Sequence, residues 1–280
     1  MYLKRILLIV VLFTLSGCKS SSTNNVVGKI SVGVVSYDTS TNYLQQYGEF
    51  ENYLGEELNS LIEIEPVFNE VKALEQISHN KWDLVLAPPG LAAIAISQHK
   101  YEPILPLEGG EKSRSVVVVK QDAPFEERSD LAGETIALGQ KGSATGYYLP
   151  LYNLYGLNFE KILFAATPNQ VLQWLDEGKA AAGALSLAQY NLYRRDFPPN
   201  SFKVLHLDRH DIPPGAILVS DRIERNLEEQ LVVKLVNTPS FISASAGYLP
   251  NGKLPNYDYM IRVIKRVQEI SPNGKLSVNK

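Results

Sequence analysis

The chain has 280 residues, 45% of them hydrophobic and 20% charged, with 19 Gly and 16 Pro. This balance excludes a disordered chain, a collagen-like repeat and a coiled coil, and it fits a globular protein with a sizeable core. One Cys excludes a disulfide framework, and four scattered His give no basis for a metal centre. A formal net charge of −3 gives no reason to expect nucleic acid as a partner. We therefore expect no metal and no cofactor.

The N-terminus has the order of regions found in a secretory signal. Two basic residues are followed by the apolar run 6–15 and then by Ser16 and Gly17. The apolar run has about half the length that spans a bilayer as a helix, which disfavours a permanent transmembrane anchor. The pattern predicts that residues 1–17 are removed on export.

The end of this segment, Leu15-Ser16-Gly17-Cys18, resembles the lipobox of bacterial lipoproteins. The resemblance implies that Cys18 is acylated and holds the protein on the periplasmic side of a membrane, at the inner or the outer membrane. A plain signal peptide that ends near a Cys is the alternative. The polar residues 18–28 are expected to form a flexible tether between the membrane and the folded part.

From Lys29 onward, short β-branched runs alternate with amphipathic stretches, which predicts α/β units around mixed, mostly parallel sheets. The expected strands are 30–35, 61–67, 83–87, 103–107, 114–120, 134–138, 160–165, 180–185, 203–207 and 215–220. The expected helices are 41–58, 69–79, 90–99, 145–156, 168–178, 187–194, 221–236, 239–246 and 256–270.

The order of these elements indicates two lobes joined by two hinge crossings. The polar segment 121–133 separates two βα series, and a return point falls near 211–215. The expected division is 29–116 for the first part of lobe 1, 117–213 for lobe 2, 214–272 for the return segment of lobe 1 with the C-terminal helices, and 273–280 for a tail. Such a clamshell binds ligands in the cleft between its lobes, at the carboxyl ends of the strands.

Two loops of the first lobe contain candidate ligand-binding residues. Tyr37 follows the first expected strand, where a ring can line a cleft, although the neighbouring hydroxyls of Ser40 and Thr41 also fit simple helix capping. Gly90 follows Pro88-Pro89 after the third strand and allows the backbone to approach a ligand closely. A tight turn without any ligand explains the same residues.

The strongest local signal is the run Gly139-Gln-Lys-Gly-Ser-Ala-Thr-Gly-Tyr-Tyr148 between an expected strand and an expected helix. Small residues let main-chain N–H groups approach an oxyanion, and the hydroxyls and the helix dipole add to the attraction. The candidate binding residues here are Ser143, Ala144, Thr145, Gly146 and Tyr147. A capped helix after a Gly-rich turn is the alternative reading.

Two further residues complete the candidate set. Asn169 lies just after Thr167, which begins a helix as its cap, and its side chain could donate into the cleft. Arg114 starts the first crossing strand, where it could pair with an anion or act in the hinge. The carboxylates occur as sequence neighbours that face different ways, and no nucleophile–base pair is present. We therefore expect no catalytic residues and no enzyme.

Three segments are similar to those of the periplasmic phosphate/phosphite/phosphonate-binding proteins of ABC transporters, across most of residues 29–247. They are Asp-Leu-Ala-Gly-Glu-Thr-Ile-Ala (130–137), Ser-Ala-Thr-Gly-Tyr (143–147) with Pro150, and Gly-Lys-Ala-Ala-Ala-Gly (178–183). The resemblance implies a type II two-lobed fold, a small oxyanion held by the hydroxyl loop, and delivery to an inner-membrane ABC permease by a monomer.

The chain departs from the family pattern at four points. Ala144 replaces the middle Thr of the hydroxyl loop, Pro168-Asn169 replaces a His-Asp pair, and Ala181 replaces an Asp. Gly90-Leu91-Ala92 replaces an aromatic residue that often follows the Pro after the third strand. The resemblance then implies that the usual groups for a ligand amine or a protonated oxyanion are missing. A sensing module of the same fold, acting on a membrane kinase or chemoreceptor, is the alternative function.

Overall fold

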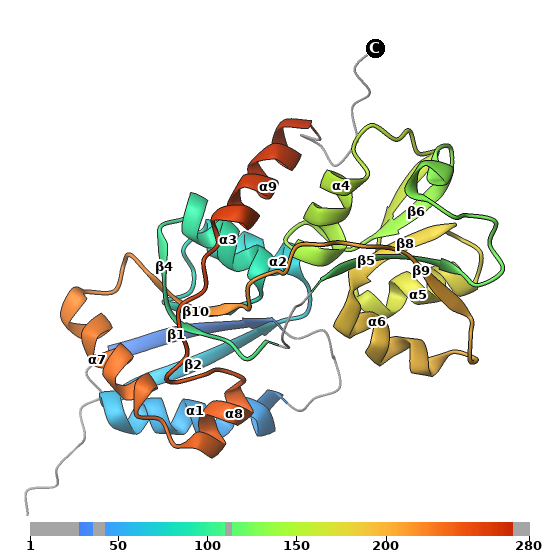
Figure 1. Cartoon of the computed structure of the whole chain (residues 1–280). Coiled ribbons are helices and arrows are strands. Elements are labelled where there is room, and N and C mark those ends of the chain that lie inside the picture. The colour runs from blue at the N-terminus through green and yellow to red at the C-terminus, as the bar shows by residue number, and fades with distance from the viewer. Residues whose placement is uncertain (1–27, 36–42, 110–113, 271–280) are drawn as a thin grey trace, which may run out of the picture.

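A computed structural model describes residues 28–35, 43–109 and 114–270, and these form two five-stranded sheets with helices on both faces of each (Figure 1). The chain forms two α/β lobes, as expected. Lobe 1 is used below for the elements around the first sheet and lobe 2 for those around the second. The predicted signal segment, the acylated Cys18, Tyr37 and the tail 273–280 lie outside the described residues.

The sheet of lobe 1 has the strand order β2-β1-β3-β10-β4. Its strands are β1 (Gly28–Val35), β2 (Ser60–Val67), β3 (Leu84–Ala87), β4 (Tyr101–Pro106) and β10 (Ala216–Ser220). Its helices are α1 (Tyr43–Leu58), α2 (Glu70–Ser78), α3 (Pro89–Gln98), α7 (Arg225–Val236) and α8 (Ser240–Ala246). Alternation along β3 explains the two faces: Leu84 and Leu86 pack with α1, α7 and α8, whereas Val85 and Ala87 pack with α2 and α3.

The sheet of lobe 2 has the strand order β7-β6-β8-β5-β9. Its strands are β5 (Ser115–Lys120), β6 (Thr135–Leu138), β7 (Lys161–Phe164), β8 (Ala182–Ser186) and β9 (Phe202–Leu207). Its α-helices are α4 (Leu149–Asn153), α5 (Pro168–Asp176) and α6 (Leu187–Tyr193), with short 3₁₀ turns at Arg128–Leu131 and Arg194–Asp196. A π-helical turn, Ala144–Tyr148, leads directly into α4.

The prediction of mixed sheets is confirmed, but parallel pairings do not predominate, because the pairings are evenly divided. In lobe 1, β1 pairs in parallel with β2 and β3, but β10 is antiparallel to β3 and β4. In lobe 2, β6 pairs in parallel with β7 and β8, but β5 is antiparallel to β8 and β9. Both inserted strands, β5 and β10, follow a crossing from the other lobe, so no βαβ connection determines their direction.

The C-terminal helix α9 (Asp258–Ile270) packs against both lobes, between α3 and α4 (Figure 1). Its buried residues Met260, Val263, Ile264 and Val267 recur at helical spacing. They belong to one hydrophobic cluster that contains α3 residues and the segment Tyr147–Leu149. The core is therefore continuous from one sheet to the other behind the cleft. None of the helices in the described ranges is long and apolar enough to cross a membrane.

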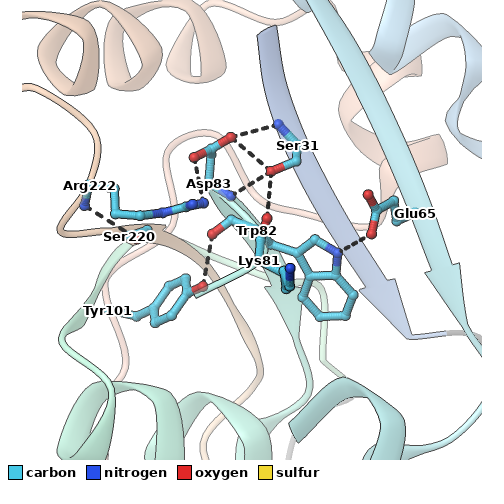
Figure 2. Close-up of polar contacts among 8 residues, drawn as sticks. All are labelled: Ser31, Glu65, Lys81, Trp82, Asp83, Tyr101, Ser220 and Arg222. Carbon is cyan, nitrogen blue, oxygen red and sulfur yellow. Dashed lines mark hydrogen bonds and ion pairs between the residues drawn. The ribbon is translucent and has the colours of Figure 1, made fainter. Parts of the chain in front are cut away.

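A polar cluster fixes the amino ends of β1 and β3, far from the carboxyl ends that face lobe 2 (Figure 2). Asp83 accepts hydrogen bonds from the backbone N–H and the hydroxyl of Ser31, each at 2.8 Å, and from the Arg222 guanidinium at 2.8 Å. The backbone N–H of Ser220 donates to the Asp83 carbonyl oxygen at 2.9 Å. One carboxylate thus connects β1, β3 and the residues that follow β10.

The neighbouring Trp82 fills the space beside β1 (Figure 2). Its ring N–H donates to Glu65 at 2.8 Å, and its carbonyl oxygen accepts from the Tyr101 hydroxyl at 2.8 Å. A Cβ at Gly33 would lie 2.1 Å from the Trp82 ring, so only glycine allows the indole to pack there. Burial raises the pKa of Tyr101 to about 12, which keeps its hydroxyl neutral.

Candidate ligand-binding site

The two lobes face each other at the carboxyl ends of their parallel strands. Lobe 1 presents the starts of α2 and α3, and lobe 2 presents the residues after β6, β7 and β8. A pocket between these edges is lined by Glu70, Gly139, Gln140, Ser143, Gly146, Ala165, Ala166, Thr167, Pro168, Val171, Ala184, Leu185 and Gln189. Its free volume is about 10 Å³, which is the lower limit for one water molecule. The pocket is therefore too small to hold a ligand in this form of the protein.

The starts of four helical segments converge on this pocket. Glu70 is the first residue of α2, Ser143 precedes the π-turn, Thr167 precedes α5, and Gln189 lies in the first turn of α6. The unpaired N–H groups and the dipole at a helix start favour negative charge. Among the described lining residues there is no Lys or Arg. Within these lining residues, positive potential comes from backbone N–H groups and helix dipoles.

Ser143 and Gly146 line the pocket, as the sequence indicated. The Ser143 hydroxyl accepts from the Gly146 N–H at 3.1 Å and caps the π-turn, so its own hydrogen remains able to donate. The capping and the binding interpretations of this loop are thus compatible. Both residues stay predicted ligand contacts.

Ala144, Thr145 and Tyr147 lie behind the pocket wall and are buried. The Thr145 carbonyl oxygen accepts from the Ser115 hydroxyl at 2.6 Å, and the Tyr147 ring packs edge-on against Tyr148 at 4.9 Å. Burial raises the pKa of both tyrosines, so both are neutral. Their direct contribution to binding remains a prediction, whereas their packing holds the loop against β5.

Gly90 is the point at which lobe 1 touches this loop. A Cβ added at Gly90 would lie 2.1 Å from the Gly142 carbonyl oxygen and 2.6 Å from the Ala144 nitrogen. Gly142 itself has φ of +117°, and a Cβ there would lie 2.6 Å from Cβ of Glu70. Two glycines therefore permit the close approach of the lobes, and at Gly142 the backbone conformation also requires one.

The start of α5 has the predicted cap. Thr167 accepts from the Gln170 N–H at 3.3 Å, and the Gln170 side chain accepts from the Ala166 N–H at 2.7 Å. Asn169 does not line the pocket, but its side-chain oxygen is buried and has no hydrogen-bond partner among the described residues. Its ligand contact stays a prediction.

Arg114 lies in the hinge rather than among the lining residues. Its guanidinium donates to Asp211 at 2.9 Å. The bond joins the two connections between the lobes, because Arg114 lies just before β5 and Asp211 lies before β10. The Arg114 side chain is 30% exposed and that of Asp211 is 51% exposed, so this pair contributes at most about 1 kcal/mol. The hinge role suggested by the sequence has a geometric basis here, and the ligand role stays a prediction.

Glu70 is the pocket residue that the sequence analysis missed. It is 5% exposed, and it is a pocket-lining residue of lobe 1. The available signal was topological: β1, β2 and β3 are parallel, so the residue that follows β2 reaches the same edge as Gly90 after β3. Gln140 and Gln189 were also not singled out.

A second polar cluster lies at the second crossing, beside α9. Asp208 accepts from the His210 N–H at 2.8 Å, from the His210 ring at 3.0 Å, and from the Asn153 amide. The His210 ring stacks on Tyr259 with centroids 4.5 Å apart. Burial raises the pKa of Asp208, but the bonds from His210 and Asn153 outweigh it and hold the pKa below its usual value.

This arrangement predicts a pH-dependent contribution to stability. Because the folded-state pKa of Asp208 is lowered, its stabilisation is present above the unfolded value of about 3.9 and is lost as the pH falls through the folded-state pKa. Asp208→Asn should lower the unfolding free energy by about 1.5–3 kcal/mol at pH 7. Urea unfolding between pH 7 and 3 should show this difference shrinking at the acidic end. A difference that stays constant with pH would contradict the assignment.

Two larger hollows lie elsewhere on lobe 2. One, of about 440 Å³, includes Arg194, Arg195 and Phe197, and the other, of about 460 Å³, includes Glu126, Arg128 and His206. Neither includes a lobe 1 residue or the start of one of the helices α4–α6. Within the described part of the chain, no group of His, Cys, Asp and Glu is arranged to hold a metal ion. The interlobe pocket is therefore the candidate site.

Comparisons with solved structures agree with this fold. XAC2383 from Xanthomonas citri, solved with ATP, has a TM-score of 0.71 at 18% identity, covering 86% of this chain and 98% of that one. A binding protein component of an ABC phosphonate transporter from Pseudomonas aeruginosa has a TM-score of 0.68 at 12% identity, and the match covers 86% of this chain and 85% of that one. PhnD1 from Prochlorococcus marinus, in complex with methylphosphonate, has a TM-score of 0.65 at 16% identity, and the match covers 86% of this chain and 99% of that one.

At these identities the structures show the fold alone. No curated protein matches the sequence. The family model described as "ABC transporter, phosphonate, periplasmic substrate-binding protein" matches residues 32–240, which is most of the chain and includes both edges of the pocket. The chain therefore belongs to the periplasmic substrate-binding proteins of ABC phosphonate transporters.

Proposed function

We propose that this protein captures a small phosphate- or phosphonate-like oxyanion in the interlobe pocket and presents it to the membrane permease. The supporting observation is the convergence of helix starts from both lobes on one pocket, which Ser143 also lines. Charge-assisted hydrogen bonds contribute about 1.5–3 kcal/mol each. Four to six of them would reach the roughly −8 kcal/mol of a micromolar complex after the entropic costs.

The pocket is too small in its closed form to contain such a ligand, so binding includes an opening step. The lobes separate at the Gly90–Gly142 contact, the oxyanion enters, and the helix starts close on it. The hydrophobic core is shared by the two lobes, and α9 packs on α3 and on α4. It would hold the lobes together on the α9 side, so that they separate at the Gly90–Gly142 contact. Closure then creates the liganded shape that a permease recognises.

Calorimetric titration with phosphate, phosphite, methylphosphonate and sulfate tests the oxyanion assignment. We expect at least one of the phosphorus oxyanions to bind with a dissociation constant of about 1 μM or lower. Ser143→Ala should weaken that ligand about tenfold, because one donor to the oxyanion is lost. Heat from none of the four anions would contradict the proposal.

The lipid anchor at Cys18 is part of the same proposal and follows from the lipobox resemblance. It would keep the protein close to its permease, with residues 18–28 as the tether. Incorporation of labelled palmitate into the wild-type protein, and its loss in Cys18→Ser, is the expected result. A cleaved but unlabelled wild-type protein would indicate a plain signal peptide.

A sensing module remains the second candidate, because Ala144 and Ala181 depart from the family's binding motifs. In that case closure would regulate a membrane kinase or chemoreceptor. Cross-linking in intact membranes followed by identification of the partner separates the two functions. A permease subunit supports transport, whereas a sensor subunit supports regulation.

A further inference from the structure

The C-terminal segment contacts both connections between the lobes before it ends in α9. Residues 247–270 are named the strap here; they follow α8 and contain α9. The family model matches residues 32–240, so the strap lies beyond the matched part of the chain. Membership of the family therefore assigns this segment no role.

The start of the strap pairs with the first connection, which leaves lobe 1 after β4. The Glu108 N–H donates to the Gly247 carbonyl oxygen at 2.7 Å. An antiparallel bridge pairs Leu107 with Tyr248, which is fully buried. Backbone pairing therefore attaches the strap to the point at which the chain leaves lobe 1.

Two tyrosines of the strap contact the second connection, which leads from β9 to β10. The Tyr257 hydroxyl donates to the Pro214 carbonyl oxygen at 2.8 Å, and Tyr257 is only 5% exposed. The Tyr259 ring stacks on His210 with centroids 4.5 Å apart. The His210 N–H in turn donates to the buried Asp208 at 2.8 Å. The strap thus holds this connection both near its beginning and near its end.

The helix of the strap, α9, packs on one helix from each lobe (Figure 1). It contacts α3 of lobe 1 and α4 of lobe 2, and its buried residues belong to the same hydrophobic cluster as residues of both. The Arg266 guanidinium lies 5.7 Å from the centre of the Tyr155 ring, in the turn after α4. The strap therefore contacts both connections and both lobes.

These contacts oppose the separation of the lobes. A rotation that opens the cleft moves α3 away from α4, and α9 cannot follow both helices. Part of its apolar face would then be exposed to water, which is unfavourable. The second connection must also change its backbone direction in such a hinge motion, whereas the two tyrosines restrain it. Both effects favour the arrangement in which the lobes are together.

We propose that the strap is a built-in restraint that favours closed lobes and sets how fast a ligand enters and leaves. Entry and release both need the lobes to separate, so contacts that are lost on opening slow both steps. In a clamshell without such a restraint, the ligand alone shifts the equilibrium toward closure. This inference rests on the opening step of the proposed function but not on the identity of the ligand.

Pulsed electron paramagnetic resonance tests the restraint in the protein without added ligand. Spin labels are placed at Val71→Cys in lobe 1 and Gln173→Cys in lobe 2, both exposed positions, and Cys18, the only natural Cys, is replaced by Ser. The test variant adds Tyr257→Phe and Tyr259→Ala to this labelled protein, which removes both contacts with the second connection. A hydrogen bond and a ring stack each change an equilibrium by about 2- to 10-fold. The ratio of open to closed protein, read from the distance distribution, should therefore rise about 4- to 100-fold.

Two matched variants distinguish the strap from an ordinary loss of packing. Tyr53→Phe removes a tyrosine hydroxyl that donates to the Lys234 carbonyl oxygen at 2.9 Å inside lobe 1. Phe197→Ala removes a ring that packs edge-on against Phe202 at 5.1 Å inside lobe 2. Neither variant should change the distance between the labels, because neither contact joins the lobes.

The outcomes separate the strap from the proposed ligand. A distance distribution that is the same in the labelled protein and in the test variant would overturn the restraint, and so would an equal shift in the two matched variants. A shift in the test variant alone supports it, even if no oxyanion binds, in which case the proposed ligand is wrong. With an oxyanion identified by calorimetry, stopped-flow measurements should show its dissociation rate constant rising about 4- to 100-fold in the test variant. An unchanged rate constant would show that the strap does not control release.

Discussion

Gly90→Ala is expected to weaken ligand binding by about 5- to 150-fold without unfolding the protein. The added methyl would lie 2.1 Å from the Gly142 carbonyl oxygen and 2.6 Å from the Ala144 nitrogen, so the lobes cannot reach their closed contact. Overpacking of this kind costs about 1–3 kcal/mol, and each 1.4 kcal/mol changes an equilibrium tenfold. Alanine suits the first turn of α3, so the helix itself should remain intact.

Calorimetry with the phosphorus oxyanion that the wild-type protein binds measures the loss, and small-angle X-ray scattering measures the opening. The radius of gyration of Gly90→Ala should exceed that of the wild-type protein. Gly48→Ala is the matched control, because Gly48 also lies in a lobe 1 helix but has no atom within 4 Å of the added Cβ. Equal affinity and equal size for Gly90→Ala and the wild-type protein would show that closure does not depend on this contact.

The regular elements could be predicted from the sequence because their signals are local. Every strand of both sheets lies within two residues of its expected range, since β-branched runs bounded by Gly, Pro or Asn define strands well. The helix expected over 145–156 is instead a π-turn followed by α4, and α7 starts at Arg225 instead of residue 221. Hydrophobic periodicity does not distinguish a π-turn from an α-helix, nor does it fix a helix end.

Pairing direction and the contacts between distant segments could not be predicted in the same way. β10 pairs antiparallel with β3, although the two strands are more than 100 residues apart in sequence. α9 was expected within lobe 1, yet it also packs on α4. Both facts depend on how the two crossings place the lobes, and no short-range pattern carries that information.

The candidate site was predicted in part, for a related reason. Ser143 and Gly146 were recognised because a Gly- and hydroxyl-rich loop before a helix is itself a signal for anion binding. Glu70 has no such local signal, since an acidic residue in a first helical turn is ordinary. Its presence in the pocket becomes visible only when β2 is known to be parallel to β1. Arg114 was given both a ligand role and a hinge role, and its pairing with Asp211 agrees with the hinge role, while the ligand role stays a prediction.

Asp83→Ala is expected to lower the unfolding free energy by about 3 kcal/mol and to leave ligand affinity unchanged. The Asp83 side chain is 19% exposed and accepts from the Ser31 N–H, the Ser31 hydroxyl and Arg222. Its removal leaves the buried Ser31 groups without an acceptor, which costs about 1–3 kcal/mol. Breaking a buried ion pair costs about 3–5 kcal/mol, but Arg222 is 44% exposed, so solvent reduces that contribution.

Thermal unfolding should show a decrease in Tm of about 6–12 °C for Asp83→Ala, as expected for a protein of this size. Asp83→Asn keeps one acceptor for Ser31 and loses the charge, so its effect should be intermediate. Asp221→Ala is the matched control, because Asp221 pairs with Lys100 at 3.8 Å in an exposed position and should change Tm little. If Asp83→Ala were as stable as Asp221→Ala, the cluster at the amino ends of β1 and β3 would not hold the sheet together. If it lost ligand affinity, that end of the sheet would be coupled to the pocket at the opposite end.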